Sequence, residues 1–244
     1  MNYSFDDFTV KILTVNNEVG KQRQLRMADQ LLAAAITDYS FSIGDLFLDS
    51  PLPQKYHHEV FNEAGVRAGE YGLMRNVCNA LSGDFKYCVI FEDDAVINED
   101  FKSVFIQHIE ALPDDWTCFF AGYGMLREST DINNLIVELP SYQCYGFSGS
   151  FCFVYKKGIA EQLRRSVYTF DVLKLFGHSK PRYAYDCVVP AWLTATNNKI
   201  YLAKKSFVGH HDGWSLILNR DRKVRQQYKP KQKIYGFEYY ESEQ

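Results

Sequence analysis

Three consecutive carboxylates, Glu92-Asp93-Asp94, are the residues of this chain best suited to chemistry. They directly follow Tyr87 to Phe91, a continuously apolar run that is typical of a strand buried on both faces of a parallel sheet. Adjacent carboxylates repel one another, and a divalent cation supplies the compensating charge. Hard ions such as Mg²⁺ or Mn²⁺ prefer carboxylate oxygens and share their coordination with substrate phosphates. The cluster therefore predicts a metal site at the end of a strand.

The alternation of side chains along an extended chain predicts how the three carboxylates divide between the two faces. Glu92 and Asp94 are expected to point the same way, with Asp93 opposed to them. The rival interpretation is an acidic start to the next helix, where the helix dipole favours negative charge. That alternative accounts for one or two carboxylates but not for three. We therefore favour the metal site, with Asp94 and Glu92 as ligands.

A second polar cluster, Gly209-His210-His211-Asp212-Gly213, lies late in the chain. Imidazole is an acceptable ligand for Mn²⁺ and a poorer one for Mg²⁺. His210 or His211 is therefore a candidate to complete the coordination of the metal. The two glycines are equally compatible with a polar turn that has no role in binding, and both interpretations stay open at this point.

Alternating strands and helices are expected to position these residues. We predict strands at 9–15, 39–43, 87–91, 116–121, 135–139 and 150–155, and helices at 22–37, 70–81, 99–111, 157–167 and 184–195. The segment 49–68 lacks periodicity and is expected to be an irregular crossing. This order predicts an α/β fold, an open and mostly parallel sheet flanked by helices with a mixed second half. Such sheets bind ligands at the carboxyl ends of their strands.

Length and composition are those of a globular protein with one full-sized domain. The chain has 244 residues, of which 46% are hydrophobic and 23% charged. We expect one catalytic domain over 1–219 and a basic C-terminal extension over 220–244. No apolar run approaches the roughly 20 residues of a transmembrane helix, and no signal peptide is expected. The 6 cysteines lack metal-type spacing and several lie in apolar runs, so buried free thiols in a reducing cytoplasm are expected.

Two motifs together resemble glycosyltransferase family 25, which includes bacterial lipooligosaccharide and collagen galactosyltransferases. They are Gly69-Glu70-Tyr71-Gly72 and the apolar strand that runs into Glu92-Asp93-Asp94-Ala95. The likeness covers roughly residues 9–215, and further agreement comes from Asn16, Arg23 and Ser148-Gly149-Ser150-Phe151. This chain has Asn76-Val77 where the family has a Ser-His pair.

The resemblance implies a GT-A fold with a mixed acceptor-side portion and a metal-dependent sugar transfer. The donor would be a nucleotide diphosphate sugar, expected to be a UDP-sugar, and the acceptor a hydroxyl group. Mn²⁺ or Mg²⁺ on Asp94, helped by Glu92 or Asp93, would neutralise charge on the leaving diphosphate. The donor-binding residues that the resemblance implies are Asn16, Arg23, Glu70, Glu92 and Asp93. For Arg23, an ordinary solvated helix charge is an equal alternative.

Transfer to a hydroxyl requires a base, a role that an ionised carboxylate can fill. Asp186 opens an apolar helical segment in the second half and aligns with an aspartate of the family, so we predict it as the base. Capping of that helix is the rival explanation. Asp212 is the reserve candidate for the base.

The acceptor is either a cell-envelope glycan or a hydroxymethylated base in DNA, as modified by some phage enzymes. The family favours the glycan. The stretch from Arg220 to Lys233 has seven basic residues opposed only by Asp221. In the DNA alternative, Arg222, Lys223 and Arg225 contact phosphates and the base is flipped outward. A solvated basic face explains the same residues. The cytoplasm, either of a bacterium or of a phage-infected host, suits both acceptors.

Two alternatives come from other classes of protein. A Mg²⁺-dependent nucleotidyltransferase would also use carboxylates at a strand end, but the N-terminal region contains no Gly-rich phosphate loop. A non-catalytic carbohydrate-binding protein would explain the 16% aromatic content but not three clustered carboxylates.

Overall fold

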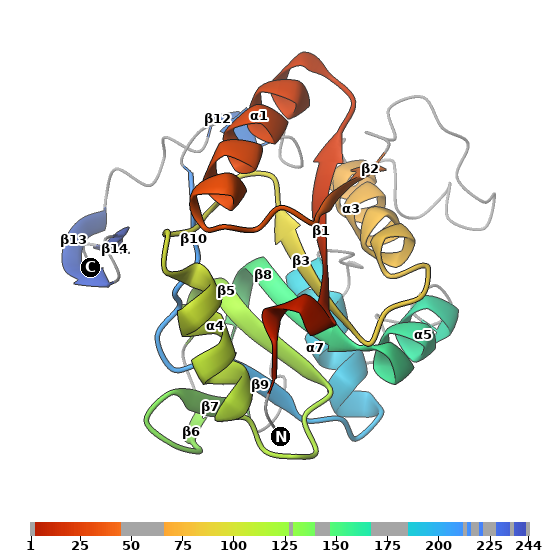
Figure 1. The fold of residues 1–244 in the computed structure, drawn as a ribbon, viewed down its shortest axis with the longest axis vertical. Coiled ribbons are helices and arrows are strands. Elements are labelled where there is room, and N and C mark those ends of the chain that lie inside the picture. The colour runs from red at the N-terminus through yellow and green to blue at the C-terminus, as the bar shows by residue number, and fades with distance from the viewer. Residues whose placement is uncertain are drawn as a thin grey trace.

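The fold was analysed in a computed structural model of the chain (Figure 1). The structure describes residues 3–44, 66–126, 129–139, 147–166, 185–211, 214–215, 220–221, 228–234 and 237–242. Within these ranges, helices pack on both faces of one 8-stranded sheet. This arrangement confirms the predicted α/β class.

The main sheet has the strand order β2-β1-β3-β8-β5-β9-β7-β6. Its strands are β1 (Phe8–Val15), β2 (Ser40–Gly44), β3 (Tyr87–Glu92), β5 (Cys118–Leu126), β6 (Thr130–Asp131), β7 (Ile136–Leu139), β8 (Phe147–Lys156) and β9 (Ile200–Ala203). β1 runs parallel to both β2 and β3, and β5 runs parallel to β9. β8 is antiparallel to both of its neighbours, as is β7. All strands except β8 and β7 thus point the same way, and the second half of the sheet is mixed, as predicted.

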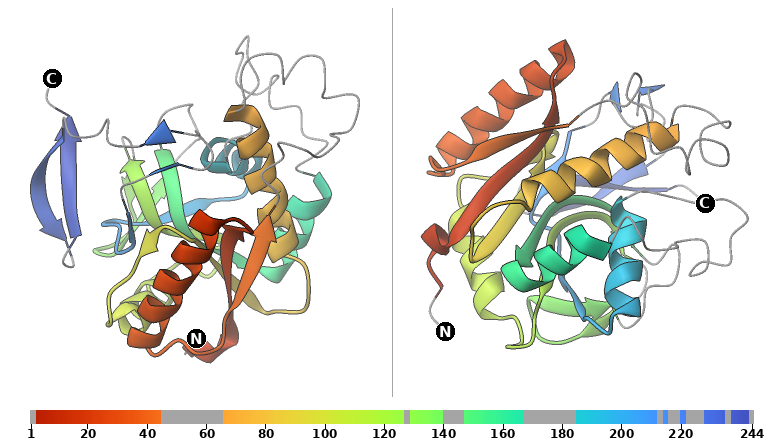
Figure 2. Two further views of the ribbon diagram at one scale, coloured as in Figure 1. Left: turned by 90° about the horizontal axis from the view of Figure 1, so that it is seen from above. Right: turned by 90° about the vertical axis from the view of Figure 1, so that its right-hand side faces the viewer.

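The helices divide between the two faces of this sheet (Figures 1 and 2). They are the 3₁₀ turn η1 (Phe5–Asp7), α1 (Glu18–Ala33), α3 (Val66–Ala80), α4 (Phe101–Glu110), α5 (Lys157–Ser166) and α7 (Tyr185–Ala195). α1 and α4 contribute to one hydrophobic core, and α3, α5 and α7 contribute to the other. Three small sheets pair β4 (Ala95–Val96) with β10 (Gly209–His210), β11 (Trp214–Ser215) with β12 (Arg220–Asp221), and β13 (Tyr228–Ile234) with β14 (Phe237–Ser242).

β3 is the buried central strand that its apolar run predicts. Val89 and Phe91 face the core under α1 and α4, whereas Cys88 and Ile90 face the core under α3 and α7, and all four are 0% exposed. Burial of both faces removes every apolar side chain of the strand from water, which is the main stabilising contribution of such a strand. The first polar side chain therefore emerges only where the strand ends, at Glu92.

The tight connection between β1 and α1 depends on two residues. The side chain of Asn17 caps α1 by accepting a hydrogen bond from the Gly20 amide at 2.7 Å. A Cβ atom at position 20 would collide with the carbonyl oxygen of Val15, so glycine permits the close approach. α1 can therefore begin directly at the carboxyl end of β1 and cover it.

The predicted elements differ from the structure mainly at their ends. α1 begins at Glu18 rather than at 22, because Asn17 caps it, and α3 begins at Val66 rather than at 70. Leu25 and Leu32 of α1 lie outside the core and are 70% and 68% exposed. β9 and β10 were not predicted at all, since each is short.

Two predictions about organisation are not tested by the structure. Most of the segment 49–68 lies outside the described residues, and the division of the chain at 219/220 stays a prediction. In the described parts of the chain, no helix combines the length and the apolar character needed to cross a bilayer. Cys78, Cys88, Cys118 and Cys152 are buried free thiols, as expected, while Cys144 and the side chain of Cys187 are not described.

Candidate functional site

The carboxyl ends of β1 and β3 meet at one edge of the sheet. The two strands are parallel and in register, with Leu13 opposite Glu92, so the residues that follow them are neighbours. The Thr14 hydroxyl donates a hydrogen bond of 2.7 Å to Oδ2 of Asp93, and both side chains are buried. Thr14 also accepts a hydrogen bond of 3.3 Å from the Gln24 amide of α1. Thr14 could not be predicted as a site residue, because in sequence it resembles any β-branched strand residue.

Arg23 projects from α1 onto the two aspartates. Its Nη1 lies 2.9 Å from Oδ1 of Asp93 and 3.5 Å from Oδ2 of Asp94. The three side chains are 13%, 7% and 9% exposed, in the order Arg23, Asp93 and Asp94. The alternative of a solvated helix charge at Arg23 is therefore wrong, because the guanidinium is enclosed between carboxylates. Its predicted contact with the donor is not tested.

The predicted division of the three carboxylates is also wrong. β3 ends at Glu92, and the chain turns at Asp93 and Asp94, so strict alternation does not continue through them. As a result Asp93 and Asp94 share one cation, Arg23. Glu92 lies on the other side, where its negative charge contributes to raising the pKa of the Tyr185 phenol of α7, a shift caused mainly by burial.

Burial dominates the electrostatics of Asp93. Removal from water raises the pKa of its carboxyl group, and the neighbouring Asp94 raises it further. The Arg23 charge and the hydrogen bonds from Thr14 and Arg23 oppose this increase without cancelling it. The carboxylate form of Asp93 therefore depends on these two partners.

Asp94 has an oxygen without a partner. Its Oδ1 is buried and accepts no hydrogen bond from the residues that the structure describes, although its Oδ2 lies near Arg23. An ionised oxygen removed from water without a donor is costly, and such an atom in a native protein calls for a ligand. Asp94 is thus the residue at which the site is open to a further positive group.

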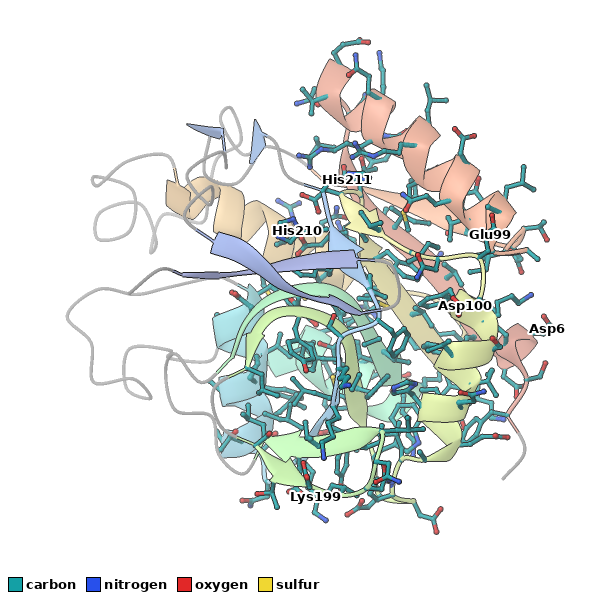
Figure 3. The ribbon with its side chains drawn as sticks, turned by 90° about the vertical axis from the view of Figure 1, so that its left-hand side faces the viewer. Asp6, Glu99, Asp100, Lys199, His210 and His211 are labelled. Atoms are coloured by element: carbon teal, nitrogen blue, oxygen red, sulfur yellow. The ribbon has the colours of Figure 1, made fainter. Side chains whose placement is uncertain are left out.

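The late histidine cluster lies beside these aspartates, as the metal prediction requires. β10 pairs antiparallel with β4, which places His210 opposite Ala95, and the His211 amide donates a 2.8 Å hydrogen bond to the Asp94 carbonyl oxygen. Both histidines are half-buried. Figure 3 shows them at the end of the sheet near α1, far from Lys199 at the opposite end. Two clusters more than 100 residues apart in sequence therefore share one site.

The two imidazoles have different surroundings. The His210 ring packs edge-on against Phe151 of β8, with 4.5 Å between centroids, and its Nδ1 lies 3.0 Å from the carbonyl oxygen of His211. These contacts hold His210 against the sheet. The hydrogen bond from His211 to Asp94 joins backbone atoms and says nothing about either imidazole, so it favours neither histidine as a metal ligand. Among the described side chains, no group of three or more His, Cys, Asp or Glu forms a metal-binding arrangement.

The segment that carries the histidines is held across the middle of β5. The Ser206 hydroxyl accepts a hydrogen bond from the Tyr123 amide at 3.2 Å and donates one to the Val208 carbonyl at 2.7 Å. A Cβ atom at Gly122 would lie 2.6 Å from Cβ of Val208, so glycine is required for this approach. The path of residues 206–211 toward Asp94 is therefore fixed by packing against β5.

Gln30 of α1 secures the turn after the aspartates. Its Nε2 donates to the Ala95 carbonyl at 3.2 Å, and its Oε1 accepts from the Ile97 amide at 3.0 Å. A single side chain thus satisfies both backbone groups of the loop that leads out of the site. Arg23 and Gln30 lie seven residues apart, about two helical turns, so one face of α1 holds both the aspartates and their loop.

Asn76 of α3 joins the first two strands at the same edge. It is 4% exposed, and its Nδ2 donates to the carbonyl oxygens of Thr14 at 3.2 Å and Ser42 at 2.9 Å. Its Oδ1 accepts from the Ser42 hydroxyl at 2.6 Å. Asn76 is therefore fully used in holding β1, β2 and α3 together.

Asp186, the predicted base, is half-buried at the start of α7. Its Oδ2 accepts a 2.7 Å hydrogen bond from the amide of Gly149, which has a φ of +70°. Gly149 precedes Ser150, the β8 residue paired with Tyr123. The carboxylate is thus oriented by the glycine motif of the sequence, and this contact leaves Oδ1 for other partners.

Several predicted site residues cannot be placed. Asp212, Arg222, Lys223 and Arg225 lie outside the described residues, and only the backbone of Glu70, within α3, is described. Asn16 is exposed at the end of β1, directly before the Asn17 cap. The structure thus brings together Arg23, Asp93, Asp94, His210 and His211, with Asn16 at the carboxyl end of β1 as well.

No family model matches this chain, and no curated protein matches it in sequence. Among solved structures, it is similar to mouse xyloside xylosyltransferase 1, with 7% identity, a TM-score of 0.42, and coverage of 78% of this chain and 82% of that one. It is also similar to a glycosyltransferase involved in glycosylation of the major capsid of PBCV-1, with 9% identity, a TM-score of 0.43, and coverage of 85% and 95%. A nucleoside-diphosphate-sugar pyrophosphorylase from Vibrio cholerae RC9 follows with 10% identity, a TM-score of 0.39, and coverage of 80% and 72%. Likenesses this remote assign no activity, and the function has to be argued from the site itself.

Proposed function

We propose that this protein is a metal-dependent glycosyltransferase that moves a sugar from a nucleotide diphosphate donor to a hydroxyl acceptor. The observation that carries the proposal is the meeting of Arg23, Asp93, Asp94 and the histidine segment at the carboxyl ends of β1 and β3. Open α/β sheets bind their ligands at this edge. A cluster of buried carboxylates there contributes little to stability by itself, which supports a role in binding.

The chemistry of the donor set fits a divalent cation. Asp94 offers a buried oxygen without a hydrogen-bond partner. His210 and His211 are further candidates beside the same turn, whereas Glu92, the other predicted ligand, lies on the opposite side near Tyr185. Mg²⁺ and Mn²⁺ bind through one or two carboxylates and complete their coordination with waters and substrate phosphates. The ion would stabilise negative charge on the leaving diphosphate.

The protein's own residues have separate tasks in this proposal. Arg23, a fixed positive charge at the N-terminal part of α1, attracts the diphosphate to the strand ends. Asp93, which accepts a hydrogen bond from Thr14, holds the guanidinium in place. Asp186 takes the proton from the acceptor hydroxyl at Oδ1, while the Gly149 amide holds Oδ2 and so orients the carboxylate.

The donor and acceptor follow from the family resemblance. A UDP-sugar is the expected donor and a cell-envelope glycan the expected acceptor. The DNA alternative depends on Arg222, Lys223 and Arg225, which lie outside the described residues, and no contact in the described part favours it. It therefore serves as a second arm of the test.

A thermal-shift screen of nucleotide sugars with and without Mn²⁺ tests the donor and the metal together. We expect one donor to raise the melting temperature only when Mn²⁺ is present, as ligand linkage requires. Transfer assays on lipopolysaccharide and on hydroxymethylated DNA then identify the acceptor. If no donor stabilises the protein in either condition, the glycosyltransferase proposal fails.

The products separate this proposal from the nucleotidyltransferase alternative. A glycosyltransferase releases a nucleoside diphosphate, whereas a nucleotidyltransferase that makes a nucleotide sugar releases pyrophosphate. Product analysis by anion-exchange chromatography distinguishes the two. A carbohydrate-binding protein would release neither product.

A further inference from the structure

Arg23 already occupies the position of a cation between the two aspartates. A single nitrogen, Nη1, lies within 3.5 Å of a carboxylate oxygen from each of Asp93 and Asp94. The Arg23 side chain is only 13% exposed, so water weakens these interactions less than it would at the surface. The guanidinium therefore offsets part of the negative charge that would otherwise attract a metal.

The two aspartates are used differently. Both oxygens of Asp93 have partners within the protein, since Oδ2 accepts from Thr14 and Oδ1 from Arg23. Asp94 contacts the same guanidinium through Oδ2 at the longer distance of 3.5 Å, and its buried Oδ1 has no partner. The closer and better satisfied pair, Arg23 with Asp93, therefore anchors the cation, while Asp94 keeps one oxygen open.

We propose that Arg23 is a built-in counter-cation, anchored by Asp93, that limits how tightly Asp94 binds a divalent ion. This inference deepens the proposed function and rests on its metal site. Asp93 is then a positioning residue for Arg23 and not a metal ligand. Asp93, Asp94 and Arg23 together have a formal charge of −1, so the guanidinium halves the negative charge of the two aspartates that a divalent ion would meet.

A counter-cation beside Asp94 makes the binding of the divalent ion weaker and therefore readily reversible. Without Arg23, the two aspartates would attract a divalent ion through a formal charge of −2. With Arg23 present, the ion is held weakly until donor phosphates complete its coordination. The site thus favours metal and nucleotide arriving together over metal bound alone.

Binding of Mn²⁺ alone, measured by electron paramagnetic resonance of the free ion, tests the inference on the full chain without nucleotide. Arg23→Gln removes the charge, and we expect it to tighten Mn²⁺ binding about tenfold. Arg23→Lys keeps the charge and should remain within about twofold of the wild type. Lys21→Gln is the matched control, because Lys21 is an exposed cation on the same helix and its loss changes the net charge equally. It should leave Mn²⁺ affinity within about twofold.

Asp94→Asn introduced together with Arg23→Gln ties the effect to Asp94. The double variant should lose the tighter Mn²⁺ binding expected of Arg23→Gln alone and should bind Mn²⁺ more weakly than the wild type. If Arg23 had only a structural role, Arg23→Gln would lower stability and weaken Mn²⁺ binding. Tighter Mn²⁺ binding by this variant therefore cannot come from a structural role. Circular dichroism checks that each variant folds, and Arg23→Met, which keeps the apolar stem, replaces Arg23→Gln if that variant does not.

The outcomes separate this inference from the proposed function. If the wild type binds Mn²⁺ and Arg23→Gln binds it no more tightly, the counter-cation role is wrong while the metal site stands. If only Arg23→Gln binds Mn²⁺ without nucleotide, the counter-cation role stands, and the thermal-shift screen with donor decides the metal dependence of the native protein. If neither binds Mn²⁺, the counter-cation role is overturned, while the proposed function is decided by that screen.

Discussion

The two ends of the main sheet both pair aspartates with basic residues, but to opposite effect. At the carboxyl end, Arg23 and Asp93 are 13% and 7% exposed. At the amino end, Lys157 and Asp84 are 45% and 95% exposed, and Lys199 and Asp115 are 49% and 54% exposed. The same kind of ion pair is therefore buried at one end of the strands and solvated at the other.

The pKa shifts record this difference in burial. At the amino end, the hydrogen bond from Lys157 lowers the pKa of Asp84, and the hydrogen bond from Lys199 lowers that of Asp115. At the carboxyl end, burial raises the pKa of Asp93 despite an arginine nitrogen 2.9 Å from its carboxylate. At the amino end a lysine partner thus stabilises the charged form of each exposed carboxylate. At the carboxyl end the burial of Asp93 disfavours its charged form, and Arg23 and Thr14 offset only part of this effect. Carboxyl groups whose pKa is shifted by burial beside a charged partner are found at binding and catalytic sites more often than elsewhere.

The largest expected effect within this comparison is on catalysis at the carboxyl end. Asp186→Asn keeps an oxygen for the Gly149 amide but cannot accept a proton, so we expect transfer to slow by about 100- to 10,000-fold with donor affinity unchanged. Steady-state rates and donor titrations measure the two quantities. Asp115→Asn, at the amino end, is the control and should keep full activity. An Asp186→Asn variant with normal transfer would remove Asp186 as the base.

Asp94→Asn should have the next largest effect. The substitution keeps the shape of the side chain but removes the charge of the oxygen that is open to a ligand, so Mn²⁺-dependent donor affinity should fall by about 100-fold or more. Isothermal titration calorimetry with the donor in the presence of Mn²⁺ measures the loss. Asp84→Asn at the opposite end should leave the affinity unchanged. Equal losses in the two variants would mean that overall charge, and not this site, binds the metal.

Thr14→Val should lower the stability of the protein and should have no direct effect on metal or donor binding. Valine has nearly the same shape but cannot donate to Oδ2 of the buried Asp93, so we expect a loss of about 1–3 kcal/mol in the free energy of unfolding. Urea denaturation followed by circular dichroism measures it. Thr14→Ser retains the hydroxyl and is expected to lose less. Were Thr14→Val as stable as the wild type, Asp93 would have to be satisfied by other donors.

Much of this framework, but only part of the site, can be predicted from the sequence. Periodicity locates α1, α3, α4, α5 and α7 and the longer strands, because each buries a face whose pattern is local. The run from Tyr87 to Phe91 likewise predicts β3 and the position of its acidic end. Because these features depend only on residues that are neighbours in the chain, they can be predicted without a structure.

The missing part of the site depends on contacts between distant residues. Nothing local marks Thr14 as a donor to Asp93, which lies 79 residues away, or Gln30 as the support of the Ala95 loop 65 residues away. The orientation of Asp94 was mispredicted because alternation was extended beyond the end of β3 into a turn. Pairing of β10 with β4, which brings His211 to Asp94, is set by the packing of Val208 on Gly122 rather than by any strand-like pattern.

The pH dependence of the melting temperature should differ, by a smaller amount, between variants of Asp93 and Asp115, which lie at opposite ends of the main sheet. Because the pKa of Asp93 is raised in the folded state, its contribution to stability is fully present below the unfolded pKa of about 3.9 and is lost as the pH rises through the folded value. Asp93→Asn removes this dependence, so its melting temperature relative to the wild type should improve as the pH is raised from about 4 to 7. Asp115→Asn should show the opposite trend at lower pH, because the pKa of Asp115 is lowered and the wild type loses its contribution as the pH falls below about 4. Identical pH dependence of the melting temperature in both variants, from about pH 2 to 7, would contradict the assignment.

The smallest effect is expected from the exposed pair at the amino end. Asp84 and Lys157 are in contact, yet the Asp84 side chain is 95% exposed, and water and salt screen such a pair almost completely. Lys157→Ala and Asp84→Asn should therefore leave both the unfolding midpoint in urea and the transfer rate unchanged within the precision of the measurements. A double-mutant cycle between the two residues should give a coupling energy near zero, and raising the salt concentration should not alter it. A sizeable coupling would show that proximity alone gives an ion pair its strength at either end of the sheet, and the contrast with Arg23 and Asp93 would then need a cause other than burial.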